Sequence, residues 1–179
     1  MRYTTSDLRA YGFVGFVPFP TWSRADIITP GQSDVEGVYA VVREAGTVPE
    51  FTDDLRPAPR RRSRTAAEAA DRWVANVAVL YFGMAPLRRA SKRGTRTGLA
   101  QRIHEYQRHG LHGGSNHHGG KLIWQTGDPD ALLVAWKVLP EGESRVVESA
   151  LIAGFRQQMG RPPFANTGAP QKGIAPIFL

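Results

Sequence analysis

The strongest constraint on the fold is an amphipathic helix near the end of the chain, within SRVVESALIAGFRQQMGRPPFAN at 144–166. Its apolar residues recur at steps of three and four, which predicts one buried helical face. Gly160 and the Pro-Pro pair just after it end this helix, because glycine accepts the left-handed terminal conformation and proline lacks the amide that another turn needs. Glu148 lies beside the apolar stripe, and Asn166 follows the stop. A glutamate at a helix edge is usually solvated, so Glu148 alone does not indicate a site.

Composition limits the class of protein. A chain of 179 residues suits a single domain, 1–179, with room for a full hydrophobic core. The absence of cysteine excludes a disulfide scaffold, a zinc ribbon and a thiol nucleophile. The sequence has no run of about 18 apolar residues, and charged residues and prolines interrupt its apolar N-terminus. We therefore expect a cytoplasmic protein that does not associate with membranes.

Positive charge is concentrated in one third of the chain. The net charge is +7, and residues 56–108 hold 13 Lys and Arg against 3 acidic residues, whereas the remainder holds 10 basic and 13 acidic residues. Such segregation is expected of a surface that faces a polyanion, and arginine suits bidentate phosphate contacts. A solvated basic face is the alternative. The candidate nucleic-acid-binding residues are Arg60, Arg61, Arg62, Arg88, Arg89, Lys92, Arg93, Arg96 and Lys121.

Strand and helix patterns together predict an α+β fold. Short apolar runs bounded by glycine and turn residues predict four strands, at 37–43, 76–83, 121–125 and 132–139. Alanine content and apolar spacing predict helices at 65–73 and 99–109, in addition to the helix that begins at Ser144.

Four stretches are predicted to be irregular. Residues 1–30 mix aromatic residues with Gly and Pro, which predicts an arm packed on the domain, with base stacking as the alternative role of its aromatic rings. RPAPRRRSR at 56–64 and MAPLRRASKRGTRTG at 84–98 predict basic loops. HGLHGGSNHHGG at 109–120 predicts a loop in preference to a histidine metal cluster, because glycine on every side leaves the ligands poorly organised. Residues 167–179 are expected to form a tail of irregular coil.

Several motifs in a fixed order resemble the GIY-YIG nuclease family. GVY stands for the first tripeptide and YFG for the second, and Arg102 to Tyr106 matches the RxxxY helix. ESALIAGFRQQMGRPPFAN at 148–166 is similar to the family's glutamate helix and terminal asparagine. The match covers about 35–166. Each tripeptide alone is weak, whereas five features in the family's order are much more specific.

The resemblance implies a fold and a reaction. The fold would be a small central antiparallel sheet flanked by helices, with an N-terminal arm and basic loop insertions. The reaction would be divalent-metal-dependent hydrolysis of phosphodiester bonds in double-stranded DNA. Glu148 would hold Mg²⁺, or Mn²⁺ in its place, because such a cation accepts one protein ligand and completes its shell with water and phosphate oxygens. Arg102 would place positive charge at a nonbridging oxygen.

The same resemblance gives roles to the remaining residues. Tyr39 is the expected general base or water-positioning group, which requires nearby cations because a free phenol has a pKa of about 10. Tyr81 and Tyr106 would orient water and phosphate. Asn166 would hold the site together through its amide. Apart from the resemblance, the place of Lys92 in the basic insertion suggests that it would assist at the phosphate.

The chain departs from the minimal family domain in its longer gaps. Tyr81 lies 42 residues after Tyr39 and 21 residues before Arg102, which implies arginine-rich insertions in both places. Enlarged loops of this kind resemble the family's stand-alone restriction endonucleases, in which one domain both recognises and cuts DNA. A double-strand break would then need a homodimer or sequential nicking. A non-cleaving DNA-binding protein and an RNA-directed or toxin-type nuclease are the alternatives.

Overall fold

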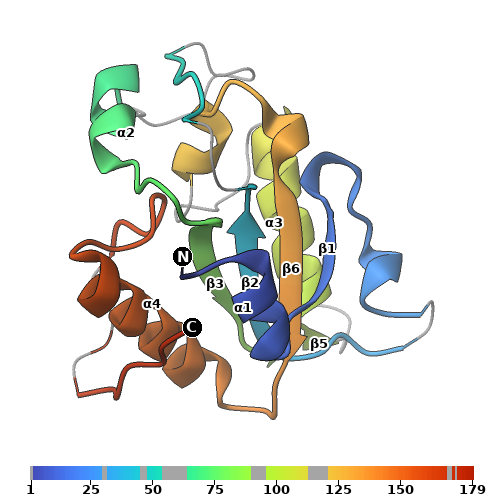
Figure 1. Ribbon diagram of the computed structural model, residues 1–179. Helices are drawn as coiled ribbons and strands as arrows, with labels where there is room; N and C mark the ends of the chain where they lie inside the picture. The colour runs from blue at the N-terminus through green and yellow to red at the C-terminus, as the bar shows by residue number, and fades with distance from the viewer. Residues whose placement is uncertain are drawn as a thin grey trace.

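The protein is built on a four-stranded antiparallel sheet with strand order β1-β6-β2-β3 (Figure 1). The strands are β1 (Val14–Pro18), β6 (Leu133–Val138), β2 (Gly37–Val42) and β3 (Val79–Ala85). The computed structural model describes residues 2–29, 32–44, 48–53, 64–89, 96–112, 121–168, 171 and 173–179. β2 lies in the centre and is buried along its whole length, which explains its continuous apolar sequence.

Helices cover both faces of this sheet. The described part of the chain holds four α-helices, α1 (Thr5–Ala10), α2 (Ala66–Arg72), α3 (Leu99–His112) and α4 (Ser144–Met159). The short 3-10 helices are η1 (Phe19–Thr21), η2 (Arg24–Asp26), η3 (Lys121–Gln125) and η4 (Pro129–Ala131). Figure 1 shows α3 behind the sheet and α1 in front of it. The predicted α+β class and central antiparallel sheet are therefore confirmed.

Alternation along β2 divides the core in two. Tyr39 and Val41 point to the face that α3 covers, where they join Leu99, Ile103 and other apolar residues. Val38, Ala40 and Val42 point to the opposite face, together with the buried side of α4 and the N-terminal segment. Successive strand residues point to opposite faces, so one strand supplies both cores. As a result, a side chain on either face can reach a common site only at an edge of the sheet.

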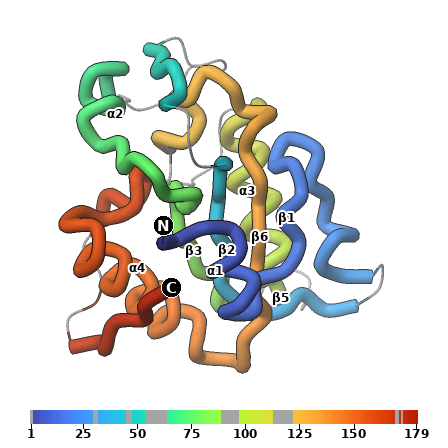
Figure 2. Tube along the Cα trace, viewed as in Figure 1, coloured from blue at the N-terminus to red at the C-terminus, as the bar shows by residue number. Residues whose placement is uncertain are grey.

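The predicted C-terminal helix is present and ends where its sequence indicates. Gly160 adopts the left-handed conformation at the C-cap of α4, with φ of 73°. Both ends of the chain lie against this helix (Figure 2). Tyr3 packs on Phe155 with ring centroids 4.6 Å apart, and the Ile177 amide donates to the Ala150 carbonyl at 2.9 Å. The described part of the tail is thus a coil, as expected, and Ile177 and Leu179 pack on the hydrophobic cluster that includes Phe155.

The prediction of an irregular arm at 1–30 is wrong. Its first part forms α1, and its second part forms β1, which adds an edge strand to the sheet by pairing with β6. Two features hide these elements in the sequence. The helix is only six residues long, and β1 contains a register shift next to Phe16, which has a positive φ of 58°. A bulged strand loses the strict alternation that identifies strands.

The predicted strand at 121–125 is also wrong, because this segment forms η3. Leu122 and Ile123 are buried side by side, whereas a half-buried strand would alternate. The Gln125 side chain donates to the Thr52 and Arg64 carbonyls at 3.3 and 2.7 Å, which fixes the end of the turn without a strand ladder. The other predicted strands and helices match β2, β3, β6, α2 and α3 within a few residues.

The basic loops are described in part. Within 84–98, Arg88–Arg89 (β4) and Arg96–Thr97 (β5) form a two-residue antiparallel ribbon. The centres of both basic loops and most of the histidine-rich loop, at 54–63, 90–95 and 113–120, lie outside the described residues. No helix within the described ranges is long and apolar enough to cross a bilayer.

Candidate active site

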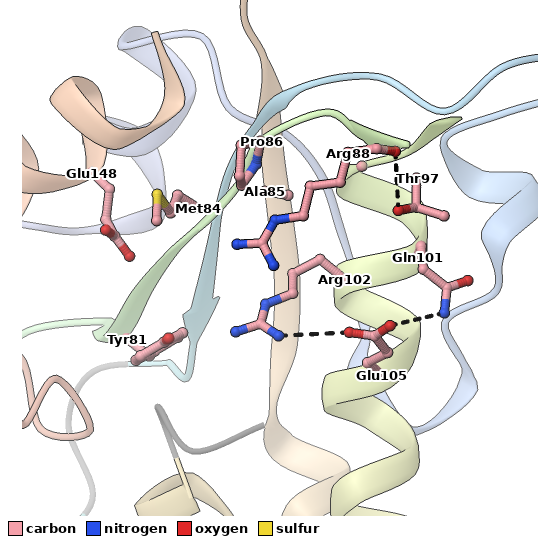
Figure 3. A pocket seen from close by; sticks show the side chains of 11 residues that line it. Tyr81, Met84, Ala85, Pro86, Arg88, Thr97, Gln101, Arg102, Glu105 and Glu148 are labelled. Atoms are coloured by element: carbon pink, nitrogen blue, oxygen red, sulfur yellow. Dashed lines mark hydrogen bonds and ion pairs between the residues drawn. The ribbon is translucent and has the colours of Figure 1, made fainter. Parts of the chain in front are cut away.

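A pocket of about 250 Å³ opens at the outer edge of β3, between α3 and α4 (Figure 3). It brings together Tyr81 from β3, Arg102 from α3 and Glu148 from α4. These residues come from three elements that are far apart in the sequence. The remaining lining residues are Met84, Ala85, Pro86, Arg88, Thr97, Gly98, Gln101 and Glu105. Three of the six predicted catalytic residues therefore face one pocket.

Glu148 reaches this pocket around the edge of the sheet. Burial raises the pKa of its carboxyl to about 7, although Arg145, the backbone amide of Met84 and Arg102 each lower it. The Met84 amide donates its hydrogen bond from the outer edge of β3. Glu148 is therefore not the solvated helix-edge carboxylate that is usual at such a position. A carboxyl with this pKa exchanges protons near neutral pH and strongly favours a neighbouring cation.

Two guanidinium groups face Glu148 across the pocket. Figure 3 shows Arg88 and Arg102 extending in parallel toward the side that carries Glu148 and Tyr81. Arg102 lies 3.5 Å from Glu105, measured from Nη1 to Oε2, and both side chains are more than a third exposed. An exposed pair of this kind contributes little, so Arg102 can exchange Glu105 for an anionic ligand. The structure places Arg88, predicted as a general nucleic-acid contact, in the same pocket as Arg102.

Three tyrosines form a cluster behind the pocket floor. The ring centroids of Tyr39, Tyr81 and Tyr106 are 5.4 to 6.1 Å apart. Burial raises the pKa of Tyr39 and of Tyr106 well above 10, and raises the pKa of Tyr81 to about 12. Of the three, Tyr81 lines the pocket, whereas Tyr39 and Tyr106 are fully buried. The phenol that can touch a ligand is thus Tyr81 and not Tyr39.

Tyr39 is nevertheless coupled to the pocket through Tyr81. A hydrogen bond between the two hydroxyl groups lowers the pKa of Tyr81 and raises that of Tyr39. This hydrogen bond links the fully buried Tyr39 to the phenol that lines the pocket.

Asn166 holds the edge of β3 without lining the pocket. Its side-chain oxygen accepts the Phe82 amide at 2.9 Å, and its side-chain nitrogen donates to the Phe82 carbonyl at 2.8 Å. Next to it, the Ala165 amide donates to the Leu80 carbonyl at 2.9 Å. Asn166 thereby acts as an extra strand residue beside the position that carries Tyr81. Its expected role of holding the site together through its amide stays a prediction.

Several predicted nucleic-acid contacts are not described. Arg60, Arg61, Arg62, Lys92 and Arg93 lie outside the described residues. For Arg89, Arg96 and Lys121 the structure describes the backbone and not the side chain. The ribbon that contains Arg89 and Arg96 borders the pocket, because its neighbours Arg88 and Thr97 line it.

The pocket suits a hard divalent cation held by a single carboxylate. Glu148 offers oxygen ligands at its wall, and the volume of about 250 Å³ leaves room for water and for substrate oxygens. Within the described residues, no group of three or more His, Asp or Glu side chains could form a metal cluster. This donor set is compatible with Mg²⁺, which retains several waters, and is unsuited to a metal that needs an all-protein shell.

Comparison of the chain with protein-family models, with curated proteins and with solved structures finds no match. Any function must therefore be inferred from the pocket and the residues that form it.

Proposed function

We propose that this protein is a divalent-metal-dependent endonuclease of the GIY-YIG type that hydrolyses phosphodiester bonds in double-stranded DNA, as a restriction-type enzyme. The main support is the convergence of Tyr81, Arg102 and Glu148 on one pocket. These are the residues that the family resemblance selects from distant parts of the sequence. Buried Tyr39 and Tyr106 directly behind them, and Asn166 at the adjacent strand edge, add to this support.

The charges in the pocket fit a phosphodiester. Arg88 and Arg102 present two guanidinium groups from one side, and guanidinium is matched to phosphate in shape and charge (Figure 3). Arg88 is exposed and Arg102 pairs with the half-exposed Glu105, so both guanidinium groups are accessible to an anionic ligand. The net charge of +7 would attract a polyanion to this face over longer distances.

Each residue then has a defined task in hydrolysis. Arg102 and Arg88 would neutralise the nonbridging oxygens as negative charge develops, which is worth several kcal/mol in a water-poor site. The Tyr81 hydroxyl, hydrogen-bonded to Tyr39, would hold the attacking water in line with the phosphorus. A cation bound at Glu148 would supply additional positive charge and lower the pKa of nearby acids. In this proposal Tyr81 keeps its expected role of orienting water, whereas Tyr39 acts only through its contact with Tyr81.

Cleavage assays with one isosteric variant test this proposal. Purified protein with Mg²⁺ or Mn²⁺ should cut duplex DNA, and EDTA should stop the reaction. Glu148→Gln should abolish cutting while retaining DNA binding, since the amide keeps the shape and loses the charge. Glu143→Gln is the matched control, because Glu143 is exposed just before α4 and makes no capping hydrogen bond.

The products distinguish the alternatives. Discrete bands from a plasmid support a restriction-type enzyme, whereas a smear indicates a non-specific nuclease. Salt-dependent binding without any metal-dependent product would favour a non-cleaving DNA-binding protein. Faster cutting of RNA than of DNA would favour an RNA-directed nuclease. Equal cutting by the parent and Glu148→Gln would contradict the proposed site.

A further inference from the structure

We propose that two buried carboxylates outside the pocket, Asp34 and Glu36, are positioning residues that hold α3 and α4 so that Arg102 and Glu148 face the same pocket. This inference rests on the proposed function for its catalytic consequence. The arrangement itself rests on hydrogen bonds that do not involve the pocket. We call residues 34–37, which end two positions before Tyr39, the junction segment.

Asp34 closes the start of α3. Its Oδ2 accepts the amides of Gly98 and Gln101 at 2.8 and 2.9 Å, and its Oδ1 accepts the Ala100 amide at 2.9 Å. Gly98 directly precedes α3, and the Ala100 and Gln101 amides lie in its first turn, where they have no partner within the helix, so Asp34 satisfies all three amides at once. Arg102 follows in the same turn, since its amide donates to the Gly98 carbonyl at 2.9 Å. Asp34 therefore determines where the helix begins and where Arg102 is placed.

Glu36 closes the start of α4 in the same way. Its Oε1 accepts the Ser144 amide at 2.9 Å, and its Oε2 accepts the Leu87 amide at 3.2 Å. Burial alone would raise the pKa of Glu36, but hydrogen bonds from the Ser144 hydroxyl and from three backbone amides lower it to about 2. Glu148 lies about one turn beyond Ser144. Leu87 directly precedes the pocket residue Arg88, so Glu36 is tied to both sides of the pocket.

The backbone of the junction segment strengthens these ties. The Val35 carbonyl accepts the Leu99 amide at 2.7 Å, and the Glu36 carbonyl accepts the Leu139 amide at 2.9 Å. Gly98 permits this approach, since a Cβ there would overlap the Val35 carbonyl oxygen. One short segment is therefore bonded to the start of α3, to the chain that leads into α4 and to the loop that follows β3.

These two carboxylates differ from ordinary helix caps in how far along the sequence their hydrogen-bond partners lie. The Asp7 and Glu68 carboxylates accept the Thr4 and Thr65 amides in local capping boxes at the starts of α1 and α2, with partners only three positions apart. Asp34 bonds amides 64 to 67 residues away, and Glu36 bonds amides 51 and 108 residues away. A local cap stabilises its own helix without placing it relative to other elements. A long-range cap fixes one element against another, which is what a site assembled from α3 and α4 needs.

Near-isosteric variants test the proposal against these local caps. Asp34→Asn and Glu36→Gln each replace one accepting carboxylate oxygen by an NH₂ group, which cannot accept a hydrogen bond from a backbone amide. Asp7→Asn and Glu68→Gln make the same change in local caps. With DNA and Mg²⁺, we expect the first pair to lower kcat about tenfold or more with little change in KM, because small misplacements of catalytic groups are costly. The second pair should leave both parameters within about twofold of the parent.

A second measurement does not depend on nuclease activity. Hydrogen exchange of the Met84 amide reports whether Glu148 still accepts its hydrogen bond. In Glu36→Gln this amide should exchange about tenfold faster, while the Phe82 amide, bonded to Asn166, keeps its rate. If Glu36→Gln does not fold, Ser144→Ala removes only one of the hydrogen bonds to Glu36 and should change exchange in the same direction.

The outcomes separate the two proposals. If the parent does not cut nucleic acid but Met84 exchange responds only to the Glu36 and Ser144 variants, the nuclease proposal fails, and the positioning of α4 by Glu36 stands. If the Asp34 and Glu36 variants match the Asp7 and Glu68 controls in kcat, KM and Met84 exchange, the carboxylates are ordinary stabilising caps. That result would overturn the positioning proposal.

Discussion

Tyr39 on β2 lies directly opposite Gly83 on β3, and its ring occupies the space where a side chain at position 83 would begin. A Cβ at Gly83 would overlap the tyrosine ring and hydroxyl. The glycine of the YFG tripeptide is therefore required by the tyrosine of GVY. Two weak sequence signals turn out to be one packing contact.

Gly83→Ala should consequently displace Tyr39 and, through it, Tyr81. We expect a loss of about 1–3 kcal/mol in the free energy of unfolding, as for other overpacked core sites. Cleavage should fall by a larger factor than binding, because the phenol at the pocket loses its orientation. Urea unfolding and cleavage kinetics measure the two effects. Gly168→Ala is the control, since a Cβ there meets nothing within 4 Å.

Because the pKa of Glu148 is raised, replacing Glu148 by an uncharged residue should stabilise the folded protein above neutral pH. Its pKa is about 7 in the folded protein and near the ordinary 4.5 in the unfolded chain. The folded state therefore loses stability as pH rises from 4.5 through 7, where this carboxyl must ionise in a buried place. In EDTA, Glu148→Gln should have a higher Tm than the parent at pH 8 and an equal one at pH 4. An equal Tm at both values would mean that the carboxyl titrates normally.

The lowered pKa of Glu36 should have the opposite effect. Its stabilising contribution is complete above the ordinary value of 4.5 and is lost as pH falls toward about 2. The difference corresponds to about 3 kcal/mol at neutral pH for this buried group. Denaturation of the parent and of Glu36→Gln should therefore differ strongly at pH 7 and much less at pH 3. A difference that is independent of pH would exclude a hydrogen-bonded carboxylate.

Arg88 provides a test of which phosphate lies in the pocket. If Arg88 shares the scissile phosphate with Arg102, Arg88→Ala should lower kcat about 10²-fold while DNA affinity changes little. Arg88→Lys should recover part of the loss, since lysine keeps the charge but not the bidentate geometry. Arg156→Ala, at an exposed position in the last turn of α4, is the control. A pure loss of affinity with a shallower salt dependence would instead place Arg88 on a flanking phosphate.

Strong periodicity made most of the fold predictable. β2, β6, α3 and α4 each combine an apolar pattern with a clear boundary, and Gly160 ends α4 as expected. β1 was not predicted because its bulge breaks the alternation, and η3 was mistaken for a strand because short apolar runs fit either structure. In both cases the missing information was a long-range contact, with β6 for the first and with the Thr52 and Arg64 carbonyls for the second.

The sequence predicted which residues belong to the candidate site, but not which of them line the pocket and which lie behind it. Spacing selects Tyr39 and Tyr81 equally, but the order of the strands decides that Tyr81 faces the pocket and Tyr39 lies behind it. The position of Arg88 depends on the path of the chain after β3, which has no periodic signal. Asp34 and Glu36 are visible as two acids before GVY, yet their partners lie 51 to 108 residues away. Such pairings become evident only in three dimensions.

The bonds along the outer edge of β3 also restrict how two copies could cooperate. The Leu80 carbonyl, both backbone groups of Phe82 and the Met84 amide are already satisfied by Ala165, Asn166 and Glu148. Four outward-facing backbone groups of this edge are therefore not available to a neighbouring molecule that would extend the sheet. In the proposed nuclease, two copies that break opposite strands of a duplex would then meet through another surface, which leaves the β3 edge of each copy open to its own DNA strand.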